Sequence, residues 1–166
     1  MSVKAKPDGY HSLTPYLSIH GAAEAIDFYK QALGATERFR LTMPDGRIGH
    51  AEIVIGDSAL MLSDPCDQGI LSGSQALPGA AVALHLYVDD VDAQFARAVE
   101  AGAKVLMPVQ DQFYGDRSGT LKDPFGHVWY LATRRENLSP EEIGQRAKAA
   151  FEADRSPAAN ATGESR

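Results

Sequence analysis

Apolar and polar residues alternate along several short stretches of the chain, which is the pattern of a strand with one buried face. In the first half of the chain these stretches are residues 13–19, 36–43, 48–55 and 58–63. After the first of them, residues 22–33 carry apolar side chains at helical spacing. Gly34 follows at the position where a helix commonly ends in a left-handed residue. The first half therefore predicts one βαβββ unit.

The same order of elements returns in the second half. The alternating stretches there are residues 82–88, 104–110, 117–122 and 127–133. Asp89 or Asp90 can cap a helix that runs to Ala101, and Gly102 then ends it. Phe28 and Phe95 fall at matching places in the two predicted helices. A repeat of this length indicates a duplicated module rather than a solenoid.

The remaining segments connect or flank the two modules. The modules are assigned to residues 10–65 and 81–135, and residues 66–80, rich in Gly, Ser and Pro without a period, to a linker loop. Residues 1–9 are expected to be a flexible N-terminus. The run Ser139-Pro-Glu-Glu142 combines an N-cap, a proline at the first position and a capping box, so it predicts a helix over 139–152. Residues 153–166 are expected to be a disordered tail.

Composition narrows the classes of function. The chain has 166 residues, a formal net charge of −6 and 44% hydrophobic residues, as expected of an ordinary globular protein. The negative charge argues against nucleic acid as a partner, because binding there depends on a basic surface. No apolar run approaches the roughly 20 residues that cross a bilayer. The N-terminus shows no secretory signal, and the single cysteine, Cys66, cannot form an internal disulfide, so we expect a cytoplasmic protein.

The predicted strands have one aliphatic face and one mixed face. Along residues 48–55, for example, Ala51 and Ile53 alternate with His50 and Glu52. On the other strands the mixed face carries Tyr16, Met61, His85, Tyr87 and Tyr130. Aromatic rings with a few polar groups are typical of a small-molecule pocket, whereas a solvated face would be richer in lysine and threonine. The alternative interpretation is a wet interface with the other module or with a second chain.

Several phrases of the sequence also resemble a known family. They are Thr14-Pro-Tyr-Leu, Ala25-Ile-Asp-Phe-Tyr29, Gly46-Arg-Ile-Gly-His-Ala-Glu52, Gln112-Phe-Tyr-Gly-Asp-Arg-Ser-Gly119 and Asp123-Pro-Phe-Gly-His-Val-Trp129. Together they resemble the PhnB-like branch of the glyoxalase/bleomycin-resistance/dioxygenase (vicinal oxygen chelate) superfamily. The resemblance implies an α+β fold in which two βαβββ modules form a curved mixed sheet around a central cavity, with the C-terminal helix added. It also implies a small-molecule ligand and a homodimer.

The resemblance bears on metal binding as well. Metal-dependent members of the superfamily use four ligands, whose positions fall near Thr14, Met61, Ala83 and Tyr130 in this sequence. A hydroxyl, a thioether, a methyl group and a phenol do not suit the ions that prefer imidazole and carboxylate. We therefore expect the usual metal site to be absent and no cofactor to be bound.

Three ionisable residues on the mixed face are candidates for catalysis: His50, Glu52 and His85. Two imidazoles and a carboxylate could form a shifted site for a divalent metal. Without metal, a His–Glu pair can act as a general base, because the carboxylate raises the imidazole pKa and fixes its tautomer. The simpler interpretation is that His50 and Glu52 only hydrogen-bond each other or a neighbouring strand.

The candidate ligand-binding residues are Tyr16, Met61, Tyr87, Arg117 and Tyr130. The three tyrosines could clamp a planar or cationic ligand. Arg117 could hold an anion or form a structural ion pair with Asp116. The leading hypothesis is a small-molecule-binding protein without the usual metal site. The alternatives are a lyase, isomerase or dioxygenase that uses the three ionisable residues with or without a divalent metal, and a face that serves only a dimer interface.

Overall fold

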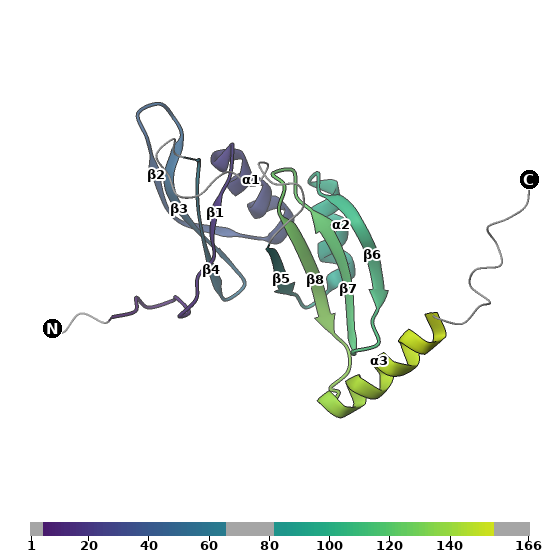
Figure 1. Ribbon diagram of the computed structural model, residues 1–166. Coiled ribbons are helices and arrows are strands. Elements are labelled where there is room, and N and C mark those ends of the chain that lie inside the picture. The colour runs from purple at the N-terminus through teal and green to yellow at the C-terminus, as the bar shows by residue number, and fades with distance from the viewer. Residues whose placement is uncertain (1–4, 66–81, 155–166) are drawn as a thin grey trace, which may run out of the picture.

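The computed structural model describes residues 5–65 and 82–154 and contains two βαβββ modules followed by one helix (Figure 1). The first module comprises β1 (Tyr16–Ser18), α1 (Ala22–Leu33), β2 (Thr36–Thr42), β3 (Ile48–Ile55) and β4 (Ser58–Ser63). The second comprises β5 (Ala83–Tyr87), α2 (Val91–Glu100), β6 (Lys104–Asp111), β7 (Asp116–Lys122) and β8 (Val128–Arg134). The last helix is α3 (Pro140–Asp154). The α+β class, the duplicated module and the C-terminal helix are confirmed.

The strand boundaries differ most at β1. The sequence pattern predicts a strand over 13–19, whereas the strand spans Tyr16–Ser18. Pro15 has no N–H to donate to a neighbouring strand, although its carbonyl still accepts from the backbone N–H of Met61 at 3.0 Å. The predicted linker, residues 66–80, and residues 155–166 of the predicted tail lie outside the described residues. The assignment of residues 153 and 154 to a disordered tail is wrong, because α3 continues to Asp154.

Each module forms its own four-stranded sheet with the same topology. The strand order is β1-β4-β3-β2 in sheet 1 and β5-β8-β7-β6 in sheet 2. The first and last strands of each module pair in parallel, and the other pairs are antiparallel. The parallel register places Tyr16 beside Met61 in sheet 1 and His85 beside Tyr130 in sheet 2. The parallel pair of strands therefore carries different side chains in each module.

Local capping fixes where the helices begin and end. The Asp64 carboxylate accepts from the backbone N–H groups of Gly21 and Ala22, at 2.9 and 3.2 Å, and so holds the start of α1. At the end of α1, Gly34 adopts the predicted left-handed conformation with φ 68°. Asp90 caps α2 by accepting from the N–H of Ala93 at 3.1 Å. At α3, Ser139 and Glu142 form the predicted capping box.

The core lies between the helices and the aliphatic faces of the sheets. Helices α1 and α2 pack against each other, and one cluster of buried residues spans both modules. Its large members include Ile26 and Ile53 from the first module and Phe95 and Leu131 from the second. The sorting of the two faces of β3 is confirmed, because Ala51, Ile53 and Ile55 are buried while His50 and Glu52 are only half-buried.

A buried carboxylate joins the two modules. Asp123, in the turn between β7 and β8, accepts from the Tyr29 hydroxyl of α1 at 2.7 Å. It also accepts from the Trp129 indole N–H at 2.9 Å and from the backbone N–H groups of Phe125 and His127. Among the described residues no strand of one sheet pairs with a strand of the other. Helix packing, this polar contact and the hydrogen bond that the Gln94 side chain of α2 donates to the Ala32 carbonyl of α1 therefore join the modules.

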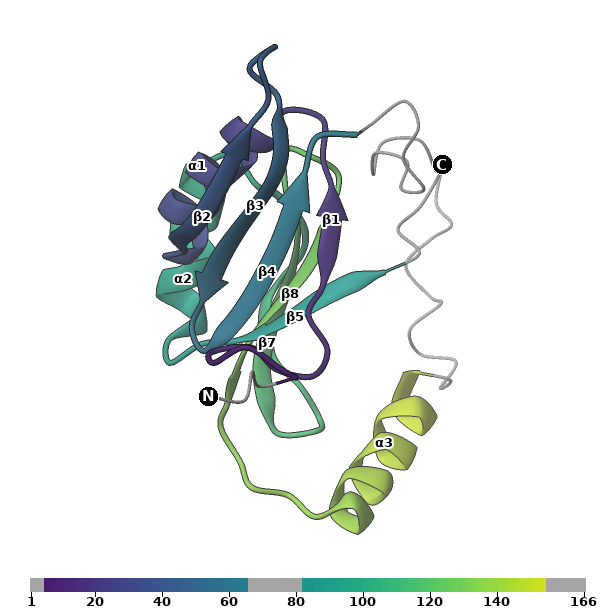
Figure 2. The ribbon, with the colours of Figure 1, turned by 90° about the vertical axis from the view of Figure 1, so that its left-hand side faces the viewer.

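In the described part of the chain, α1 and α2 cover one face of the sheets, and we call the other face the open face (Figures 1 and 2). It includes Tyr16, His50, Glu52 and Met61 in sheet 1, and His85, Tyr87 and Tyr130 in sheet 2. Figure 2 views sheet 1 from its open side, and the second module lies behind it. The sequence leaves open whether the modules face each other within one chain. In the structure, the open face of sheet 1 points away from sheet 2.

Candidate ligand-binding site

A chain of hydrogen bonds crosses the open face of sheet 1. Strand β3 places His50 and Glu52 on the same side, and the His50 Nε2 lies 3.2 Å from a Glu52 carboxylate oxygen. The Tyr16 hydroxyl of β1 lies 3.1 Å from His50 Nδ1. Because an ionised carboxylate can only accept, Nε2 is assigned the proton, and Nδ1 accepts from Tyr16. The predicted His50–Glu52 pair is thus formed, with its imidazole oriented toward Tyr16.

The N-terminal segment, residues 5–15, contributes to this face. The Tyr10 hydroxyl donates a hydrogen bond to Glu52. The Arg38 guanidinium lies over the Tyr10 ring, 4.9 Å from its centroid, and donates to the Gly9 carbonyl at 3.2 and 3.3 Å. Sequence reasoning missed Tyr10 and Arg38, because no periodicity marks a contact between an irregular segment and a distant strand.

These neighbours determine the ionisation of the Glu52 carboxyl group. The Tyr10 hydroxyl, and to a smaller extent the His50 imidazole, holds the pKa of the Glu52 carboxyl below its usual range, although partial burial acts in the opposite direction. Glu52 is therefore ionised at neutral pH. A cavity of about 500 Å³ adjoins it, lined by Ala5, Lys6, Pro7, Tyr10, His11, Ser12, Thr14, Glu52 and Met61. The predicted residues Glu52 and Met61 both belong to this cavity.

Three aromatic rings gather on the open face of sheet 2. The His85 ring lies 4.8 Å from the Tyr87 ring and 6.0 Å from the Tyr130 ring, with an angle of 14° between the planes of His85 and Tyr130. Tyr87 and Tyr130 are 60% and 42% exposed. The Tyr87 hydroxyl donates to Asp116 at 2.8 Å, and this bond, together with some burial, raises the pKa of Tyr87. These rings present a surface on which a planar molecule can stack.

The three candidate catalytic residues are not brought together within one chain. His50 and Glu52 belong to sheet 1, whereas His85 belongs to sheet 2. In the part of the chain that the structure describes, no three His, Cys, Asp or Glu side chains form a group that could hold a metal ion.

The four positions that the resemblance implies for a metal do not fit one either. Thr14 and Met61 line the cavity on sheet 1, and Ala83 and Tyr130 lie on sheet 2. Their side chains offer a hydroxyl, a thioether, a methyl group and a phenol, which are poor ligands for the divalent ions that prefer imidazole and carboxylate.

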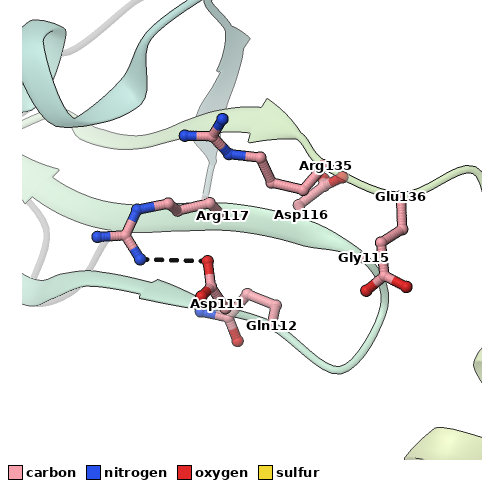
Figure 3. Close-up of a pocket in the computed structure, with 7 residues that line it drawn as sticks. All are labelled: Asp111, Gln112, Gly115, Asp116, Arg117, Arg135 and Glu136. Carbon is pink, nitrogen blue, oxygen red and sulfur yellow. Dashed lines mark hydrogen bonds and ion pairs between the residues drawn. The ribbon is translucent and has the colours of Figure 1, made fainter.

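Arg117 is bound by carboxylates other than the one expected. It donates to both oxygens of Asp92, at 2.7 and 2.8 Å, and to Asp111 at 3.1 Å. Figure 3 shows the bond to Asp111. The Asp92 and Asp111 carboxylates raise the pKa of Arg117 further above its usual value. Asp116, the predicted partner, instead accepts from Tyr87. A cavity of about 440 Å³ beside Arg117 is lined by Asp111, Gln112, Gly115, Asp116, Arg117, Arg135 and Glu136. Binding of an anion by Arg117 remains a prediction, and it would compete with two carboxylates.

A smaller cavity lies between the modules. Its volume is about 220 Å³, and its lining is mostly apolar. The residues come from the N-terminal segment, β3, β4, β5 and β8 and include Leu60, Leu84, His85 and Trp129. His85 thus lies between this cavity and the open face of sheet 2.

Comparison with known proteins now defines the family. The family model described as the Glyoxalase/Bleomycin resistance protein/Dioxygenase superfamily matches residues 17–131, which span both modules. The chain belongs to this superfamily. The narrower assignment to its PhnB-like branch remains a prediction.

Three similar proteins illustrate the relationship. An uncharacterised protein of Mycobacterium bovis is 40% identical over 146 residues, covering 86% of this chain and 93% of the relative. The structure of protein PA1353 from Pseudomonas aeruginosa has a TM-score of 0.61 and 29% identity, covering 76% of this chain and 99% of the other. TnmS3, an antibiotic binding protein from Streptomyces, has a TM-score of 0.56 and 25% identity, covering 81% and 98%. Within the described residues, no helix has the length and apolar character needed to cross a membrane.

Proposed function

We propose that this chain is a cytoplasmic small-molecule-binding protein that holds a planar ligand against its open sheet faces, without the metal site usual in the superfamily. The observation that carries the proposal is the ring cluster of His85, Tyr87 and Tyr130, in which the two tyrosine side chains are exposed. Exposed aromatic surface of this kind marks binding sites. The likeness to an antibiotic binding protein supports the same conclusion.

The complete site is proposed to form between two copies of the chain. The open face of sheet 1 points away from sheet 2, so a ligand held by both would need a second copy to bring them opposite each other. Exposed apolar side chains on the outer strands of both open faces support such pairing: Phe39, Leu41 and Met107 are 51%, 52% and 49% exposed. Sedimentation at micromolar concentration tests the pairing, and a monomer at all concentrations contradicts it.

Equilibrium dialysis against a panel of planar antibiotics and metabolites, bleomycin included, tests ligand binding. Replacing a stacking ring by alanine is expected to weaken a bound ligand about tenfold, since such ring contacts contribute roughly 0.5–1.5 kcal/mol beyond their buried area. Tyr130→Ala and Tyr87→Ala are the test variants, and Val99→Ala, a partly exposed position on α2, is the control. If no ligand binds, or if the tyrosine variants bind as the native chain does, the proposal fails.

A second candidate function rests on the Glu52–His50–Tyr16 hydrogen-bond chain. A carboxylate that fixes the tautomer of an imidazole is the arrangement of a general base, so a lyase, isomerase or dioxygenase remains the alternative. In its metal-dependent form His85 would have to come from the second copy. Elemental analysis after soaking with Zn, Ni, Mn and Fe(II) tests this form. About one bound equivalent that is lost in His50→Ala supports it, and a metal-free protein under every condition removes it.

A further inference from the structure

Tyr10 occupies the polar centre of the open face of sheet 1 in the way that a bound molecule would. The ring comes from an irregular segment that precedes β1, not from the sheet itself. Its hydroxyl donates to Glu52, and the Arg38 guanidinium covers one face of its ring at 4.9 Å. The ring also forms part of the wall of the 500 Å³ cavity. The side chain is thus a phenol bound through its hydroxyl and through its π face.

The groups that hold Tyr10 define what could replace it. Glu52 is ionised, and its side chain is only 17% exposed, so loss of the Tyr10 hydroxyl leaves a carboxylate oxygen short of a donor. A replacing molecule must therefore bring an O–H or N–H. Arg38 is attracted to the electron-rich face of an aromatic ring. Arg38 lies against the Tyr10 ring, and Lys6 belongs to the cavity wall. Because both side chains are positively charged, they repel an aromatic cation, which is therefore a poor competitor of Tyr10.

The geometry points to a phenolic ligand, a hydroxylated aromatic ring, as the molecule that the site on sheet 1 binds, with Tyr10 as its competitor inside the same chain. This inference rests on the proposed function, in that it names the ligand class for one of the two open faces, that of sheet 1. A cavity of about 500 Å³ falls within the range of about 300–1,000 Å³ for small-molecule sites. Binding exchanges one phenol for another at Glu52, and the segment around Tyr10 is released.

The test replaces the internal phenol by an external one. In Tyr10→Ala the missing side chain corresponds to 4-methylphenol, and 4-methylanisole is the matched probe that lacks the donor hydrogen. Calorimetric titration is expected to show 4-methylphenol binding Tyr10→Ala about tenfold or more tightly than the native chain, because the competitor is gone. It should also bind at least about tenfold more tightly than 4-methylanisole, as a hydrogen bond to a charged group requires.

Two further variants, made in the Tyr10→Ala background, test whether the hydroxyl of the probe contacts Glu52. Glu52→Gln removes the charge that the phenol hydroxyl meets, so the preference for 4-methylphenol over 4-methylanisole is expected to fall several-fold. Val99→Ala on α2 is the control and should leave that preference unchanged. Equal affinity for the two probes, or a preference that survives Glu52→Gln, overturns the inference.

A measurement on the native chain keeps the inference testable if Tyr10→Ala does not fold. The NMR signals of the Gly9 and Tyr10 backbone amides are expected to move toward their unfolded-chain positions when 4-methylphenol is added and to stay unchanged with 4-methylanisole. Unchanged signals at saturating 4-methylphenol contradict competition. The two proposals can fail separately: a native chain that binds nothing in the ligand panel, beside a Tyr10→Ala variant that selects 4-methylphenol, rejects the proposed function and retains the phenol site.

Discussion

The hydrogen bond between Tyr29 and Asp123 allows a quantitative prediction of how much one contact between the two modules contributes to the free energy of unfolding. Tyr29→Phe removes one hydroxyl and leaves the ring in place. The hydroxyl donates to Asp123 at 2.7 Å, Tyr29 is fully buried, and the Asp123 side chain is 1% exposed. Among the described residues, the substitution leaves Trp129 as the one side chain that donates to that carboxylate oxygen.

The expected cost follows from the charge and burial of the partner. A hydrogen bond to a charged group contributes about 1.5–3 kcal/mol, and water cannot readily replace a donor at a buried carboxylate. We therefore expect Tyr29→Phe to lower the free energy of unfolding by about 2 kcal/mol. Asp123→Asn should cost at least as much. In the native chain four donors share the two carboxylate oxygens, whereas asparagine offers them a single acceptor oxygen.

Urea unfolding followed by fluorescence provides the assay, since Trp129 is the only tryptophan of the chain and donates to Asp123. The denaturation midpoint should fall while the slope stays constant. Tyr114→Phe is the matched control: its hydroxyl lies 3.3 Å from the neutral Ser118 hydroxyl, so a loss below about 1 kcal/mol is expected. A Tyr29→Phe variant within about 0.5 kcal/mol of the native chain would refute the role assigned to this contact.

Three further outcomes are expected. Burial lowers the pKa of His127, against the opposing effect of Asp123, so the native state takes up fewer protons than the unfolded chain below pH about 6.5. The free energy of unfolding should therefore fall as the pH drops through that value, and His127→Asn should flatten the dependence in urea titrations. Gly119→Ala places a Cβ 2.5 Å from the Phe95 ring and should cost roughly 1–3 kcal/mol in thermal unfolding, whereas Gly144→Ala, with no neighbour within 4 Å, should not destabilise the chain. Ser139→Ala removes the cap of α3 and should speed amide exchange there by roughly fivefold, for a loss of about 1 kcal/mol.

Most of the secondary structure could be predicted because it depends on local patterns. The alternation along residues 48–55 identified both the limits of β3 and its buried face. The sequence Ser139-Pro-Glu-Glu142 identified the start of α3, since the capping box is formed within four residues. Predictions of this kind need no knowledge of how distant segments pack.

Contacts between distant segments could not be predicted in the same way. Tyr10 and Glu52 are separated by 42 positions, and Tyr29 and Asp123 by 94. Periodicity reports which side of a strand is buried, but not which irregular segment crosses the other side. The partner of Arg117 was missed for the same reason, because Asp92 lies on α2 and Asp111 at the end of β6.

Along each strand, residues that face the helices alternate with residues on the open face, and the two sets are under different evolutionary constraints. Residues that face the helices form the buried core, and their neighbours one position away lie on the open face, where we propose that the ligand binds. Each module keeps its own sheet, so the two open faces are made of different strands. Open-face positions of one module can therefore vary without changing those of the other, and the two copies of the duplicated module can diverge independently. The carboxylate and imidazole of one sheet and the ring cluster of the other are the outcome expected of that freedom.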